Sequence, residues 1–116
     1  MPTPHLPAAA ARRALRKLGA DIHDARRRRQ LPMAVVADRA FTSRSTLQKI
    51  EAGDPTVSMG IYASVLQALG LLAGLANVAD IANDSVGQTL ARADLPKRVR
   101  IKRTGLKQTP GALGDG

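Results

Sequence analysis

The sequence has no cysteine and almost no aromatic residues, with one Phe, one Tyr and no Trp among 116 residues. The absence of cysteine excludes disulfides, thiolate metal sites and cysteine nucleophiles. The two histidines, His5 and His23, do not have a metal-ligand spacing, so we expect no metal and no other cofactor. Hydrophobic residues still make up 44% of the chain. Because Ala and Leu favour helices and a sheet-like alternation is missing, we predict an all-α fold.

Long apolar runs are also missing. No stretch approaches the roughly 20 residues of a membrane span. The N-terminal stretch has its positive charges after its apolar part, the reverse of a signal peptide. These features predict a soluble, cytoplasmic protein with no membrane partner.

Acidic residues are scarce, with nine Asp and Glu against eighteen Lys and Arg, and the net charge is +9. Residues 1–30 hold eight basic and two acidic residues, residues 31–95 hold four and six, and residues 96–116 hold six and one. A chain that is basic at both ends favours a polyanion, with nucleic acid ahead of a membrane surface. The alternative is a solvated basic protein with no polyanion partner.

Proline, serine and glycine residues mark the ends of the predicted helices. Pro7 can open the first helix, and Ser43 and Ser58 are good N-caps for the third and fourth. Gly53 and Gly70 stop those two helices. The predicted helices span residues 8–29, 32–40, 44–52, 59–69, 71–79 and 86–93, with Ser85 as the cap of the last.

The predicted domain organisation follows these helix boundaries. We expect an N-terminal extension over residues 1–14 and a domain of about five helices over residues 15–72. A helical dimerisation or partner segment would follow over residues 73–95. Residues 96–116 would form a basic and then flexible tail, with a short strand over residues 98–102 because charged and apolar residues alternate there.

Two short helices separated by a tight turn form the most specific motif, LPMAVVADRAFTSRSTLQKIEAGDP at residues 31–55. This segment resembles the helix-turn-helix of the Cro/lambda-repressor type, the XRE family, and the resemblance covers residues 18–72. Ala37 lies at the small-residue position where the two helices touch. The expected core consists of Leu18, Ile22, Val36, Ala37, Leu47, Ile50, Ile61, Val65 and Leu69.

The resemblance implies roles for individual residues. An Arg on the first helix pairs with the Glu near the end of the recognition helix, which implies a structural ion pair between Arg26 and Glu51. The recognition helix would enter the major groove, with Arg44 as the side chain suited to a bidentate contact with guanine. The implied DNA-binding set is Ser43, Arg44, Ser45, Thr46, Gln48, Lys49, Arg27 and Arg28. The alternative for these residues is solvent-exposed helix surface.

Three residues depart from the family pattern. Met33 stands where the family often has a Gln that anchors the second helix to the DNA backbone. Pro32 replaces the usual Ser or Thr cap. Phe41 stands where Gly commonly takes the left-handed conformation, at a cost of about 1 kcal/mol for a bulky residue.

The apolar residues after Gly70 exceed what the predicted domain needs. Because one recognition helix reads too few base pairs for useful specificity, we expect a homodimer that binds a palindromic double-stranded DNA operator. The candidate dimer or partner residues are Leu71, Leu72, Leu75, Val78 and Ile81, with Val99 and Ile101 adding a strand. The alternative is a fifth helix folded back onto the same subunit.

Three segments resemble HipB-like antitoxins, which pair with HipA-family kinase toxins: ALRKLGADIHDARRRR, SRSTLQKIEAGDPTVSMGIYASVLQALGL and LPKRVR. The resemblance implies a repressor of its own operon that also binds a kinase toxin. The alternatives are a stand-alone regulator without a toxin and a helix-turn-helix module used for protein interaction. We expect no enzyme, because no catalytic set of residues is in view: Asp21 and Asp24 face different sides of one helix.

Overall fold

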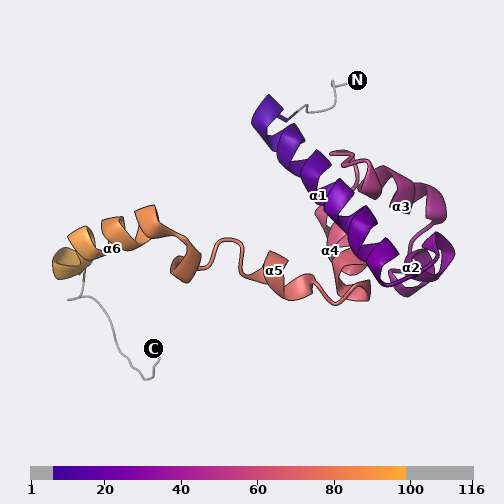
Figure 1. Ribbon diagram of the computed structural model, residues 1–116. Coiled ribbons are helices and arrows are strands. Elements are labelled where there is room, and N and C mark those ends of the chain that lie inside the picture. The colour runs from indigo at the N-terminus through magenta and orange to yellow at the C-terminus, as the bar shows by residue number, and fades with distance from the viewer. Residues whose placement is uncertain (1–6, 99–116) are drawn as a thin grey trace. The chain divides into compact units, whose positions relative to one another are not determined.

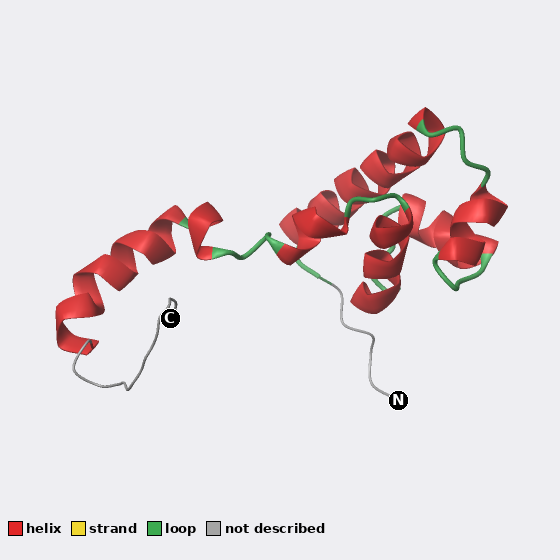
Figure 2. Cartoon of the chain, turned by 90° about the horizontal axis from the view of Figure 1, so that it is seen from below, coloured by secondary structure: helices red, strands yellow, loops and turns green. Residues whose placement is uncertain are grey.

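A computed structural model describes residues 7–98, and every regular element within that range is helical (Figures 1 and 2). The all-α prediction is therefore confirmed. No helix in the described range is both long enough and apolar enough to cross a membrane. The helices are α1 (Ala9–Arg28), α2 (Met33–Arg39), α3 (Arg44–Glu51), α4 (Met59–Ala68), α5 (Leu72–Ala76), the 3₁₀ helix η1 (Ile81–Asn83) and α6 (Ser85–Arg98).

The chain divides into two compact units, the first ending at Ala76 and the second beginning at Asn77. Helices α1–α5 belong to the first unit. The strand predicted over residues 98–102 is wrong at Arg98, which ends α6. The rest of that strand, including Val99 and Ile101, and the predicted tail from residue 99 onward lie outside the described residues.

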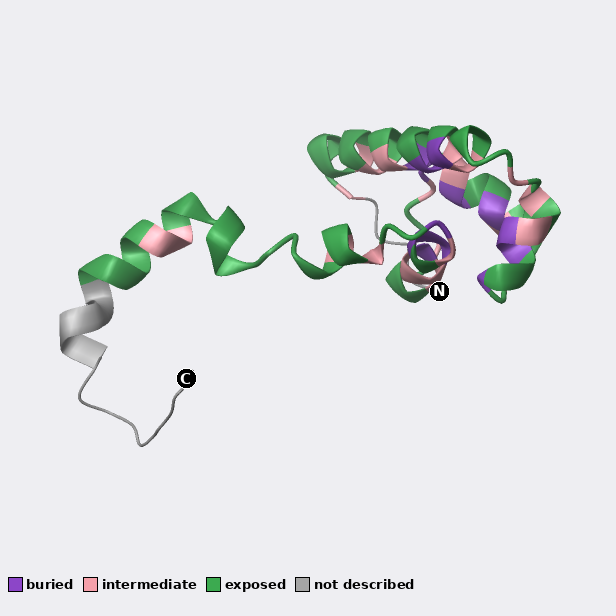
Figure 3. Ribbon diagram, turned by 60° about the horizontal axis from the view of Figure 1, so that its bottom comes forward, coloured by how far each residue is buried: buried purple, intermediate pink, exposed green. Residues whose placement is uncertain are grey.

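The first unit is built around one aliphatic core (Figure 3). Seven of the nine predicted core residues are buried, and the other two, Leu18 and Ile61, are half-buried against the same cluster. Tyr62 also lies in this core, a position that no sequence pattern indicated. The buried residues are Ile22, Ala25, Val36, Ala37, Ala40, Leu47, Ile50, Tyr62, Val65, Leu66 and Leu69.

Side-chain caps and left-handed residues set the helix ends as the sequence predicts. The Ser43 hydroxyl accepts a hydrogen bond from the Thr46 amide at 3.1 Å, and Ser58 does the same for Ile61 at 3.3 Å. Phe41 has a φ of 57° and is almost fully exposed, so the turn before α3 is built on a strained residue. Pro32 precedes α2 without a side-chain cap.

The backbone of α1 lies close against the backbone at the C-terminal end of α3. A Cβ atom on Gly19 would lie 2.5 Å from the carbonyl oxygen of Ile50 and 2.6 Å from the amide nitrogen of Gly53. A Cβ atom on Gly53 would likewise lie 2.5 Å from the Cα atom of Arg16. Only glycine allows this approach, which fixes α3 against α1.

The second unit is held by polar contacts. Asp80 caps η1 through the Ala82 amide at 2.8 Å, and Asn83 and Gln88 donate to backbone carbonyls. The prediction that Ser85 caps the last helix is wrong, because the Gly87 amide donates to Asp84 Oδ1 at 2.9 Å. None of residues 77–93 is buried, and large apolar side chains are exposed at Val78, Ile81, Val86 and Leu90.

Candidate nucleic-acid interface

Helices α2 and α3 form a helix-turn-helix, and one face of α3 is exposed to solvent. Leu47 and Ile50 point into the core with no exposed area, which anchors α3 from its inner side. The opposite face of the helix holds side chains that are exposed: Arg44, Ser45, Gln48 and Lys49. Arg44 and Lys49 carry positive charge, and the face has donors and acceptors suited to base edges.

The hydroxyl groups at the start of α3 already have protein partners. Ser43 accepts from the Thr46 amide and donates to the Thr46 hydroxyl at 3.0 Å, and a weaker 3.4 Å contact joins Ser43 to Ser45. Ser43 is exposed and Thr46 is half-buried. Each oxygen keeps acceptor or donor capacity toward solvent, because a hydroxyl has one donor and two lone pairs.

Arg26 and Glu51 join α1 to the end of α3 in a nearly buried ion pair. Arg26 Nε donates to Glu51 Oε2 at 2.7 Å, and Nη2 donates to Oε1 at 3.2 Å. The third guanidinium nitrogen, Nη1, donates to the Leu31 carbonyl at 3.0 Å. Only 11% of the Arg26 side chain and 8% of the Glu51 side chain are exposed. The pair therefore ties α1, the α1–α2 turn and α3 together.

His23 is a third member of this cluster that the sequence patterns did not indicate. Its Nδ1 lies 2.7 Å from Glu51 Oε1, so the ring N–H donates to the carboxylate. His23 precedes Arg26 by three residues on the same side of α1, and this i, i+3 spacing was the available signal. Burial alone would raise the pKa of Glu51, but hydrogen bonds from Arg26 and His23 outweigh burial and lower that pKa below its ordinary 4.5.

Arg27 and Arg28 occupy the last turn of α1, where both are exposed. Together with Asp24 they line a shallow hollow. Two guanidinium groups beside one carboxylate leave a net positive charge there. The arginine Arg29 beside them donates to the Ala25 carbonyl at 2.9 Å.

Residues 17–78 match the protein family described as "Helix-turn-helix domain", which is more than half of the chain. The chain belongs to this helix-turn-helix family. The match agrees with the XRE-like resemblance of residues 18–72 and with a DNA-binding regulator. The comparisons with curated proteins and with solved structures give no match.

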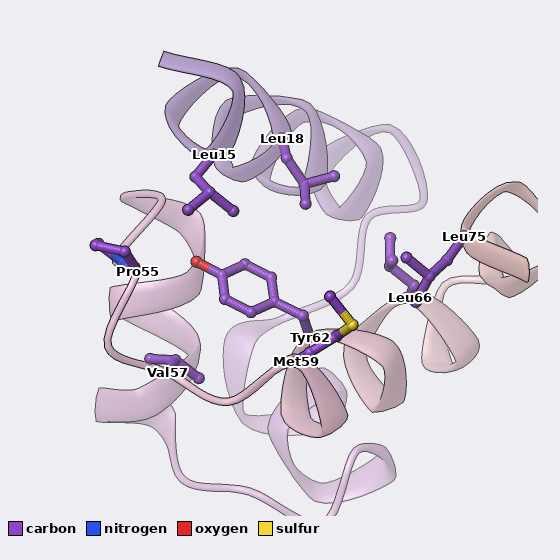
Figure 4. Close-up of a pocket in the computed structure, with 8 residues that line it drawn as sticks. All are labelled: Leu15, Leu18, Pro55, Val57, Met59, Tyr62, Leu66 and Leu75. Atoms are coloured by element: carbon purple, nitrogen blue, oxygen red, sulfur yellow. The ribbon is translucent and has the colours of Figure 1, made fainter. Parts of the chain in front are cut away.

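The first unit of this helix-turn-helix protein also contains an apolar groove of about 240 Å³ (Figure 4). The Tyr62 ring forms part of its lining, and the Tyr62 hydroxyl donates to the Asp54 carbonyl at 2.7 Å. Burial and the nearby Asp54 charge raise the pKa of Tyr62, so the hydroxyl stays protonated near neutral pH. The groove is lined by Leu15, Leu18, Pro55, Val57, Met59, Tyr62, Leu66 and Leu75.

The lining of the groove is almost entirely apolar. Its lining offers a single hydroxyl, and that hydroxyl is already hydrogen bonded. Within residues 7–98, no group of three or more His, Asp or Glu side chains is placed to hold a metal ion. The exposed face of α3 is therefore the candidate functional surface of the first unit.

Proposed function

We propose that this protein is a sequence-specific repressor that binds double-stranded DNA through α3. The observation that carries the proposal is the face of Arg44, Ser45, Gln48 and Lys49, which is exposed on a helix whose other side is fixed in the core. A helix of this diameter fits the major groove of B-form DNA, where every base pair shows a distinct pattern of donors and acceptors.

In this proposal some residues contact base edges and others contact phosphates. The Arg44 guanidinium takes O6 and N7 of a guanine, and Gln48 and Lys49 reach neighbouring bases. Ser43 and Thr46 at the start of α3 contact the phosphate backbone. Arg27 and Arg28 contribute further phosphate contacts from the end of α1. The phosphate contacts fix the position of α3 in the groove, and the base contacts supply specificity.

A single α3 reads too few base pairs for useful specificity, and we propose that the protein binds as a homodimer. A two-fold dimer places two recognition helices about 34 Å apart, one turn of DNA, over a palindrome. Exposed apolar side chains at Leu71, Val78 and Ile81 support such an interface. Leu72 and Leu75 are half-buried, and Leu75 packs against its own core.

Replacing Arg44 by alanine is expected to weaken binding to the cognate site by about 1–3 kcal/mol and to relax specificity at one base pair. The measurement is fluorescence anisotropy with duplexes from the region upstream of the coding sequence, followed by footprinting. The footprint should show two half-sites one turn apart. The control is Arg92→Ala, which removes an exposed charge from the second unit. Equal losses on the cognate site and on random DNA would make Arg44 a backbone contact.

We further propose that the protein is the antitoxin of a HipA-family kinase toxin and represses the operon that encodes both. Support comes from the second unit, because residues 77–93 bury no side chain and expose four large apolar ones. An apolar surface of this kind marks a protein-interaction site. The proposal places the protein in the bacterial cytoplasm.

The double variant Val86→Ser/Leu90→Ser tests the toxin partner in the full chain. These two exposed residues are four apart on α6 and so lie on one face. We expect the variant to lose co-purification with the kinase-like product of the adjacent gene while DNA binding is retained. Unchanged co-purification, or the absence of such a gene, would contradict the antitoxin role and leave the repressor role intact.

A further inference from the structure

The first three turns of α1 carry a concentration of positive charge, and two of its four cations have a partner within the fold, Arg12 in the Pro7 carbonyl and Lys17 in Asp21. No acidic residue occurs before Asp21, and the first turn of α1 has none. We define the N-terminal basic patch as Arg12, Arg13, Arg16 and Lys17. Arg13, Arg16 and Lys17 are exposed, and Arg12 is half-buried. Among the described residues, only Lys17 of this patch has a salt bridge, to Asp21 at 2.6 Å.

This charge pattern opposes helix formation. The N-terminal end of a helix dipole is positive, and its effect is confined to the first turn, so it disfavours Arg12. Like charges three or four residues apart on a helix repel each other, and the patch contains three such pairs: Arg12 with Arg16, Arg13 with Arg16, and Arg13 with Lys17. A surface that lowers helix stability in the free protein points to an anionic partner.

The patch is fixed in position relative to α3. Gly53 follows shortly after the end of α3. A Cβ atom on Gly53 would lie only 2.5 Å from the Cα atom of Arg16. Arg12 and Arg16 lie on the same flank of α1 as Gly19 and His23, since these residues follow at steps of three and four. Gly19 and His23 both meet the C-terminal end of α3. The cations therefore belong to the same rigid body as the recognition helix.

We infer that the N-terminal basic patch binds the phosphate backbone of DNA that flanks the base pairs read by α3. This inference rests on the proposed function and extends the DNA contact beyond α3, Arg27 and Arg28. Arg12 and Arg28 are 16 residues apart, which corresponds to about 24 Å along α1. Duplex DNA presents about 14 phosphates over that length, whereas a rigid row of cations matches an acidic protein surface only by chance.

The test compares the full-length protein with the variant Arg13→Gln/Arg16→Gln. Glutamine keeps helix propensity and removes only the charges. Affinity for a 40-base-pair duplex of random sequence is measured as a function of NaCl concentration. The slope of log affinity against log salt should fall by about 3.6, which is about 0.9 for each of the four phosphate contacts that the bound homodimer loses. The loss should be the same on the cognate duplex, and the melting temperature should be equal or higher because repulsion is relieved.

Arg92→Gln is the matched control, because it removes an exposed charge from α6 of the second unit and should leave the slope unchanged. A slope in Arg13→Gln/Arg16→Gln equal to that of the wild type would overturn the inference while the proposed function stands. The same holds if the variant loses only the binding of an acidic protein partner. A wild-type protein that binds no duplex would overturn the proposed function itself.

Discussion

Replacing Glu51 by glutamine is expected to lower the free energy of unfolding by about 3 kcal/mol. The substitution keeps the volume of the side chain but leaves the Arg26 charge without its counter-ion in a site where only 11% of it is exposed. Removing one partner of a buried pair costs about 3–5 kcal/mol. We expect the lower end, because Arg26 keeps its hydrogen bond to the Leu31 carbonyl and glutamine still accepts one. Urea denaturation followed by circular dichroism measures the change.

The control is Asp21→Asn, which breaks the exposed Lys17–Asp21 pair of the same helix. An exposed pair contributes little to stability, so its denaturation midpoint should hardly move. Similar midpoints for the Glu51 and Asp21 variants would contradict the structural role of the Arg26–Glu51 pair.

The stability contributed by Glu51 should also depend on pH in a defined direction. Arg26 and His23 lower the pKa of this carboxyl from its ordinary 4.5 in the folded state. A lowered folded-state pKa stabilises the protein above the unfolded-state pKa, and this stabilisation disappears as pH falls through the folded-state value. The difference in unfolding free energy between wild type and Glu51→Gln should be constant above about pH 5 and shrink below 4.5.

Replacing Gly19 by alanine is expected to lower the free energy of unfolding by about 3 kcal/mol, the upper part of the range for overpacking. The new methyl group would meet three backbone atoms, of Ile50, Glu51 and Gly53, at 2.5–2.8 Å. Backbone atoms cannot move aside by changing rotamer, so α1 and the end of α3 must separate. Such a shift would also displace Glu51 from Arg26 and weaken DNA binding.

Gly74→Ala is the matched control, since it introduces the same methyl group within α5. Nothing lies within 4 Å of a Cβ atom at that position. Alanine should stabilise that helix by about 0.5–1 kcal/mol because glycine has poor helix propensity. Thermal melts of both variants, with anisotropy on the cognate duplex, give the comparison. A Gly19→Ala protein as stable as Gly74→Ala would show that the approach of α1 and α3 is looser than the structure has it.

Local sequence signals determined much of the first unit. The N-caps Ser43 and Ser58, the left-handed glycine at Gly53 and the spacing of the aliphatic residues act within one turn or one helix, so they can be read from the sequence. The family resemblance also indicated which Arg and Glu lie together, although they are 25 residues apart. These signals suffice to place the candidate DNA-binding face on α3.

Only the tertiary structure decided which side chains from different segments meet. Tyr62 fills the core because its hydroxyl reaches the Asp54 carbonyl, and His23 joins Glu51 because α1 and α3 cross there. At the start of α6 the sequence analysis assigned the cap to Ser85, whereas in the structure Asp84 accepts the hydrogen bond of the Gly87 amide. Sequence patterns report periodicity and propensity along one helix, whereas these contacts depend on how helices cross, and the close approach at Gly19 and Gly53 sets that crossing.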